Sequence, residues 1–192
     1  LRATGPDSGS ARTTLPYTLK LAFSDPWGVR VGGDAWVRQT DAGTRETGGG
    51  DPGVVLKYRF GPTSPWGVEL GEKFPSAGPT LGSGRADTTL NGIYSNDFGD
   101  WHTDINLAET RVGLPGGQAH GWQAGWAASL AHPLAGDWGI GGEFSGTHQA
   151  AVPDTAQFLA ALSWNASPRA AFDFGVARGL TDASPRNQVF GG

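Results

Sequence analysis

Apolar and polar residues alternate along most of this chain, and that pattern restricts the fold more than any other feature. Leu56, Tyr58 and Phe60, for example, alternate with Lys57 and Arg59. Successive side chains of a β-strand point to opposite faces, so each such segment has one apolar and one polar face. No segment combines helical periodicity with capping residues. The sequence therefore predicts an all-β protein with almost no helix.

The alternation defines about ten complete strands, each close to the length that a tilted membrane-spanning strand needs. They are expected at 16–24, 28–38, 53–60, 66–74, 86–96, 101–111, 121–131, 138–148, 155–164 and 170–179. Short turns at 25–27, 61–65, 97–100, 133–137 and 165–169 alternate with longer loops at 39–53, 75–85, 112–120 and 149–154. Membrane barrels have short periplasmic turns and long outer loops. We expect an antiparallel up-and-down transmembrane β-barrel.

Aromatic residues flank the short turns. The stretch Pro26-Trp27-Gly28-Val29 recurs at 65–68, and a looser version occupies 137–140. Aromatic rings of membrane proteins gather at the level between acyl chains and headgroups. The expected aromatic girdle consists of Phe23, Trp27, Phe60, Trp66, Trp101, Trp138, Trp164 and Phe172.

The polar set of the alternation is expected to line the lumen and to form any solute path. It consists of Lys20, Arg30, Asp34, Trp36, Arg38, Lys57, Arg59, Glu69, Lys73, Asp87, Asn91, His102, Asp104, Asn106, Glu143 and Asp173. Its basic members precede Phe74, whereas most acidic members follow it. Either one wall is basic and the opposite wall acidic, or the charges pair locally, as Arg30 with Asp34. Trp36 is the one inward aromatic, able to stack on a solute or to fill space.

Composition removes several other classes. The formal net charge of −4 does not favour a nucleic-acid partner. The chain has no cysteine, and its four histidines lack short ligand spacing, so we expect no metal site and no cofactor. Ser145 and Thr147 lie near His148, but Ser145 is expected inside and no acidic partner is evident. The expected role is therefore not enzymatic.

The middle of the chain resembles a known family. The segments "VVLKYRFG", "GVELGEKFPSAG" and "GSGRADTTLNGIYSNDFGDWHTDINLAETRVG", within 50–180, are similar to the meta-pathway of phenol degradation family of outer-membrane transporters. Gly92 and Thr88 stand where larger apolar residues are expected. The resemblance implies a barrel in the bacterial outer membrane that transports small aromatic or hydrophobic compounds.

The two ends predict a single barrel domain over 1–192 that is truncated at both ends. Residues 1–15 are expected to form an outer loop, with 1–4 as the end of a strand, and 187–192 to begin the final strand. The intact barrel would then have about twelve strands. Our principal hypothesis is an outer-membrane channel whose partners are the lipid bilayer and a small solute. The alternatives are a structural, adhesive or lipid-modifying barrel and a soluble β-sandwich or barrel that binds ligands.

Overall fold

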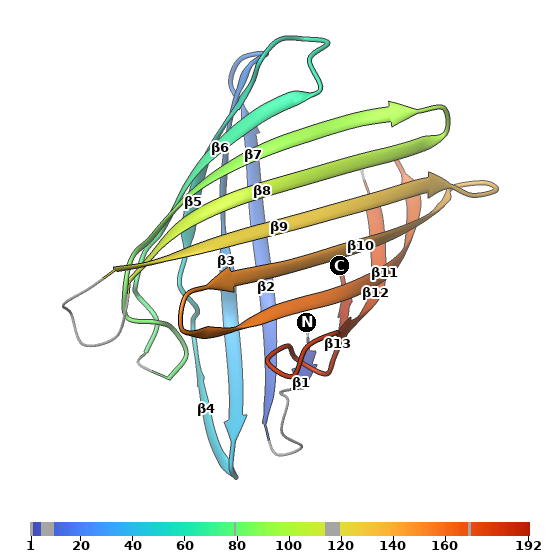
Figure 1. Ribbon diagram of the computed structural model, residues 1–192. Helices are drawn as coiled ribbons and strands as arrows, with labels where there is room; N and C mark the ends of the chain where they lie inside the picture. The colour runs from blue at the N-terminus through green and yellow to red at the C-terminus, as the bar shows by residue number, and fades with distance from the viewer. Residues whose placement is uncertain (1, 5–9, 79, 114–119, 169) are drawn as a thin grey trace.

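The computed structural model describes residues 2–4, 10–78, 80–113, 120–168 and 170–192, and strands make up most of them (Figure 1). The strands are β1 (Arg2–Thr4), β2 (Ala11–Ala22), β3 (Trp27–Asp41), β4 (Thr44–Gly48), β5 (Gly53–Arg59), β6 (Trp66–Lys73), β7 (Asp87–Phe98), β8 (Trp101–Gly113), β9 (His120–Pro133), β10 (Trp138–Gln149), β11 (Val152–Ser167), β12 (Ala170–Gly179) and β13 (Asn187–Gly191). No helix in these residues is long and apolar enough to cross a membrane.

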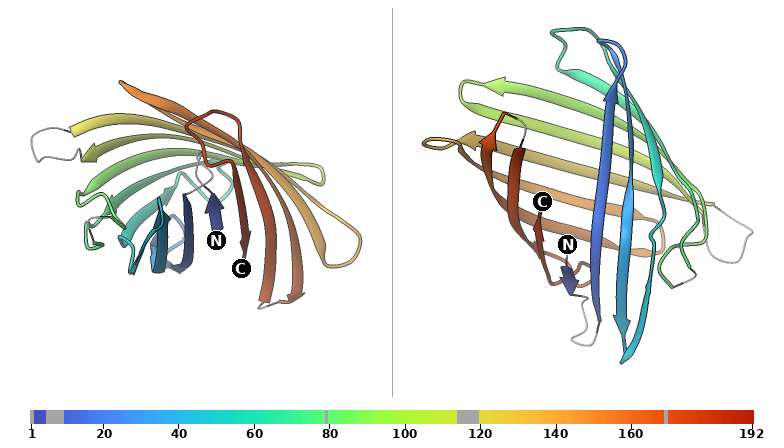
Figure 2. Two further views of the ribbon diagram at one scale, coloured as in Figure 1. Left: turned by 90° about the horizontal axis from the view of Figure 1, so that it is seen from below. Right: turned by 180° about the vertical axis from the view of Figure 1, so that it is seen from behind.

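All of these strands belong to one antiparallel sheet whose pairings return to their starting point. From β5 to β13 each strand pairs with the next, β13 pairs with β1, β1 with β2, β2 with β3, and β3 with β5. The strand β4 lies outside this circuit and pairs with the last part of β3. Two views show the sheet rolled around a central space with both termini at the same side (Figure 2). The fold is an up-and-down β-barrel.

The predicted strands are confirmed with shifts of a few residues at their ends. Two of the expected long loops differ. Residues 39–48 continue β3 and return as β4 through a two-residue turn at Ala42–Gly43, and β10 and β11 are joined by Ala150 and Ala151 alone. Part of the loop expected at 112–120 lies outside the described residues. We call the rim that carries the turns after β2, β5, β7, β9 and β11 the turn end, and the opposite rim the loop end.

The apolar surface of this barrel lies on its outside. Leu19, Leu107 and Val176 are 69%, 66% and 58% exposed. Among the described residues, the only buried apolar side chains are those of Val37, Leu81, Ile93 and Ala177. A water-soluble β-protein of this size would hide its leucines and tryptophans in a core. The fold is therefore inverted relative to a soluble protein.

The irregular pairing at Pro16 makes one part of the predicted alternation wrong. Leu15 is paired with Trp36, but Pro16 is paired with Asp34, so Ala35 is an extra residue in β3. Proline has no N–H to donate, and the ladder is irregular where it occurs. The extra residue reverses the facing of the rest of β3. Trp36 and Arg38, which we expected inside, share the outer face with Leu15, and the Arg38 guanidinium lies 4.9 Å from the Trp36 ring centroid.

Candidate functional site: the lumen

The register places the other predicted lumen residues on the inner face. Directly paired inner residues include Lys20 with Arg30, Lys57 with Glu69, and Lys73 with Asp87. Asn91, His102, Asp104, Asn106, Glu143 and Asp173 follow on the same face of β7 to β12. This face is also rich in glycine, alanine and threonine, which leaves room inside.

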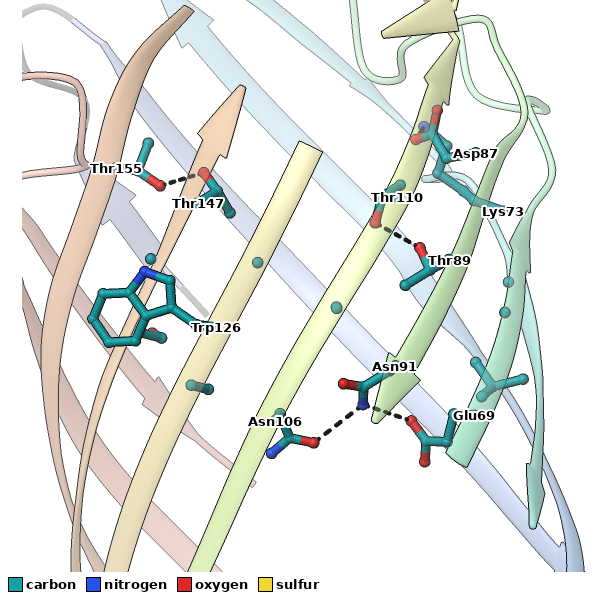
Figure 3. Close-up of a pocket in the computed structure, with 18 of the residues that line it drawn as sticks. Glu69, Lys73, Asp87, Thr89, Asn91, Asn106, Thr110, Trp126, Thr147 and Thr155 are labelled. Atoms are coloured by element: carbon teal, nitrogen blue, oxygen red, sulfur yellow. Dashed lines mark hydrogen bonds and ion pairs between the residues drawn. The ribbon is translucent and has the colours of Figure 1, made fainter. Parts of the chain in front are cut away.

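A cavity of about 700 Å³ lies against this inner face, towards the loop end. Its charged lining residues on the inner face come from β3, β6 and β7, and they are Arg30, Glu69, Lys73 and Asp87, while Glu72 borders the cavity from an outer-face position of β6. Apart from Trp126, which has an outer-face position in β9, and Pro185, the lining residues from β8 onwards contribute hydroxyl, amide and small side chains, and none is charged. In Figure 3, Glu69, Lys73 and Asp87 lie on one side of the cavity wall, and Thr147 and Thr155 lie on the other. The cavity thus has one ionic side and one neutral side.

Two hydrogen-bonding clusters flank the small residues of the cavity wall. On one side, Asn91 bonds to Asn106 at 3.1 Å and to Glu69 at 3.4 Å (Figure 3). On the other side, the hydroxyls of Thr147 and Thr155 lie 2.7 Å apart. A further pair joins Thr89 and Thr110 at 2.9 Å. We call the strip between these clusters, formed by Ala108, Gly125 and Ala127, the small-residue floor.

Many charges on the ionic side of the cavity are paired with opposite charges on the same side. Glu69 lies 3.5 Å from Arg30 and 3.9 Å from Lys57, and Lys73 pairs with both Asp87 and Asp51. Asp34 pairs with Arg12 at 3.7 Å, so the local pairing expected between Arg30 and Asp34 is not the one observed.

Some inner charges stand outside these pairs. Lys20 and Arg59 lie on β2 and β5 and have no ion pair in the described part of the chain. The same holds for Glu143 and Asp173, which are on β10 and β12. An excess of positive charge therefore stays on the wall formed by β2, β3 and β5, while β10 and β12 carry negative charge.

The loop between β6 and β7 is fixed at the loop end. One Asp51 oxygen accepts hydrogen bonds from the backbone N–H groups of Ser76 and Ala77, at 2.9 and 2.8 Å. The Leu81 side chain is buried beside Gly48, and its carbonyl accepts a hydrogen bond from Arg12 at 3.1 Å. We call residues 74–78 and 80–86 the anchored loop. Because Arg12 belongs to β2, the loop reaches across the inner side of β3 and β4.

The loop between β12 and β13 borders the cavity as well. The Ser184 hydroxyl is buried; it accepts a hydrogen bond from the Ala156 N–H and donates one to the Ala156 carbonyl, at 2.9 and 2.8 Å. Gln188 donates to Gln157 at 2.6 Å. The sequence analysis did not identify Ser184, Gln157, Thr147 and Thr155 as lumen residues. The alternation of the strands alone would have placed the last three on the inner face.

Two histidines lie beside carboxylates. At the turn end, the His102 Nδ1 is 2.6 Å from Asp97, and its Nε2 is 3.2 Å from Asp104 and 3.5 Å from the Ser95 hydroxyl. Because Asp104 is the nearer partner of Nε2, this nitrogen is directed to a carboxylate rather than to the serine. His148 has an acidic partner that the sequence did not indicate, Asp154 at 2.7 Å, but Ser145 lies on the opposite face of β10. No group of three or more potential metal ligands occurs among the described residues.

The predicted girdle residues form an exposed aromatic series at the turn end. Trp138 stacks on Trp164 with centroids 5.9 Å apart, and Trp164 on Phe172 at 5.8 Å. Trp27 lies against Tyr58 and Trp66 against Tyr94. Each of the eight predicted residues is at least 38% exposed.

Similarity to known proteins is found in the backbone and not in the sequence. The structure is similar to a solved porin structure refined at 1.8 Å resolution, with a TM-score of 0.48 and 15% sequence identity. The similarity covers 95% of this chain and 60% of the porin, so the chain spans less than two thirds of that protein's length. No family model matches the sequence, and no curated protein matches it.

Proposed function

We propose that this protein is a β-barrel of the bacterial outer membrane that conducts small solutes through its lumen. One observation carries the proposal: the outer face of several strands changes character in the same order. On β8 it runs from Trp101 through Ile105 and Leu107 to Arg111. On β6 and β12 aromatic residues at the turn end are likewise followed by aliphatic residues and then by Glu72 and Arg178.

This order fits a bilayer. An apolar band between an aromatic rim and a charged rim is what a membrane barrel presents to lipid. The same surface would be unfavourable in water, because a contiguous exposed apolar area of this extent makes protein molecules associate. Polar groups on the inside and closed backbone pairing complete the requirements of a structure that spans a membrane.

The chemical class of the transported solute is judged from the side chains that line the lumen. The family resemblance favours small aromatic or hydrophobic compounds, but the lumen offers few aromatic faces. Among the described residues, Trp126 is the one aromatic residue that borders the cavity, and its register pairs it with Leu107 on the outer face. The inner lining supports passage of polar solutes instead.

Single-channel recording of the purified protein in planar bilayers tests the proposal. Two adjacent alanines provide a matched pair, because Ala127 borders the cavity and Ala128 lies on the outer face beside Phe144. Ala127→Trp should reduce the conductance by about half or more, whereas Ala128→Trp should leave it unchanged. A folded wild-type protein without any conductance would contradict channel function and favour the structural, adhesive or lipid-modifying alternative.

A further inference from the structure

The neutral side of the cavity has the features of a binding surface for one chemical class. We propose that it binds an uncharged, polyhydroxylated ring compound of the size of a monosaccharide. This inference rests on the proposed channel function for its biological meaning, but the binding itself can be measured separately.

The shape of the wall is the first argument. An added Cβ at Gly125 would meet only the Cβ of Ala108, at 3.8 Å, so the small-residue floor is open to the lumen. Ala127 continues the floor by one inner position along β9. A flat ring can lie against such a surface, and the volume of about 700 Å³ is within the usual range of small-molecule sites.

The hydrogen-bonding groups at the two edges of the floor are the second argument. Each threonine hydroxyl offers one donor and two acceptor positions, and the Thr147–Thr155 bond uses one donor and one acceptor of the pair. The pair retains a donor and several acceptors for a ligand. On the opposite edge, the amides of Asn91 and Asn106 offer both kinds of group. A ring with hydroxyls on its circumference can reach both edges at once.

The third argument excludes charged and aromatic ligands. Lys73 and Arg30 already have carboxylate partners, so an ionic ligand would have to displace an existing pair to gain one of its own. An aromatic ligand would need a stacking partner, and in the part of the chain that the structure describes no aromatic side chain of the inner face borders the cavity. Hydroxyls exchange their bonds to water for bonds to the wall without either cost.

Titration of the folded protein with glucose, followed by saturation-transfer NMR, tests the inference. Thr147→Val with Thr155→Val keeps the shape but removes both hydroxyls, and should weaken glucose binding about tenfold, the loss of one to two hydrogen bonds. Gly125→Leu fills the floor and should abolish binding. Thr18→Val is the control, since Thr18 lies on the inner face of β2, outside the cavity lining.

The outcomes separate the two proposals. Saturable glucose binding that falls in both lumen variants and persists in Thr18→Val supports the inference, even if the protein conducts nothing. Absence of glucose binding to folded wild-type protein overturns it, even if the protein conducts ions. Equal glucose affinity in all variants, or binding of phenol in competition with glucose, overturns it as well. Far-ultraviolet circular dichroism of each variant establishes that it is folded.

Discussion

At the scale of single residues, the face of the strand on which a residue lies decides which side chains are tolerated there. Neighbouring residues on one strand face the outside of the barrel and the lumen in turn, so identical side chains have different constraints. Gly125 and Ala127 border the cavity, while Ala128 between Ile105 and Phe144 lies on the outer face. The same substitution at adjacent positions should therefore have different costs.

Ala128→Arg should lower the free energy of unfolding by about 2–4 kcal/mol, because it puts a charge at mid-depth on the apolar face. Ala127→Arg should cost less than about 1 kcal/mol, because its charge projects into the polar lumen. Urea unfolding in lipid vesicles, followed by tryptophan fluorescence, measures both values. Equal costs would show that the assignment of faces is wrong.

The sequence predicts the facing of side chains well, except beyond one irregular position in β3. Alternation correctly assigned Arg30, Lys57 and Asn106 to the inner face, because a strand has no other periodicity available. It assigned Trp36 and Arg38 wrongly, since the extra residue Ala35 is invisible to a simple count. Pro16 was the available signal, because a proline inside a strand marks an irregular ladder.

At the scale of elements, the anchored loop is held by contacts that no local pattern in the sequence predicts. Asp51, Arg12 and Leu81 are far apart in the chain, and they come together because β2 and β5 both pair with β3. Strand positions follow from local patterns, but such contacts follow from the curvature of the whole sheet. The cavity was unpredictable for the same reason.

Leu81→Ala should release the anchored loop. Loss of a buried leucine side chain costs about 2 kcal/mol at the low end of the usual range, which corresponds to roughly thirtyfold more frequent opening. Limited trypsin digestion at Arg85, quantified by mass spectrometry, should accelerate accordingly. Leu180→Ala is the control, because Leu180 is 54% exposed. Unchanged cleavage at Arg85 would mean that the Asp51 hydrogen bonds hold the loop without Leu81.

At the scale of the whole molecule, the separation of charge across the lumen should govern ion preference. Replacing Arg30, Lys57 and Arg59 together by glutamine removes most of the basic wall. The reversal potential in a salt gradient should shift towards cation preference, and the shift should fade at 1 M salt, where screening acts within about 3 Å. An open triple variant with unchanged preference would show that the basic wall does not select ions.

The two rims should also face different compartments. Thr44→Cys, at the loop end, should react on intact cells with a membrane-impermeant maleimide, whereas Ser64→Cys, in the turn after β5, should react only after the outer membrane is permeabilised. This follows from the usual orientation of short turns towards the periplasm. The opposite pattern would invert the topology.

The hairpin of β3 and β4 has a practical consequence for the proposed orientation of the barrel. Ala42 and Gly43 have positive φ values of 45° and 85°, as a two-residue hairpin turn requires, and an added Cβ at Gly43 would meet nothing within 4 Å. The circuit of paired strands does not include β4. A peptide epitope inserted between Ala42 and Gly43 would thus leave the wall intact, and in the proposed outer-membrane orientation antibodies would recognise it on intact cells.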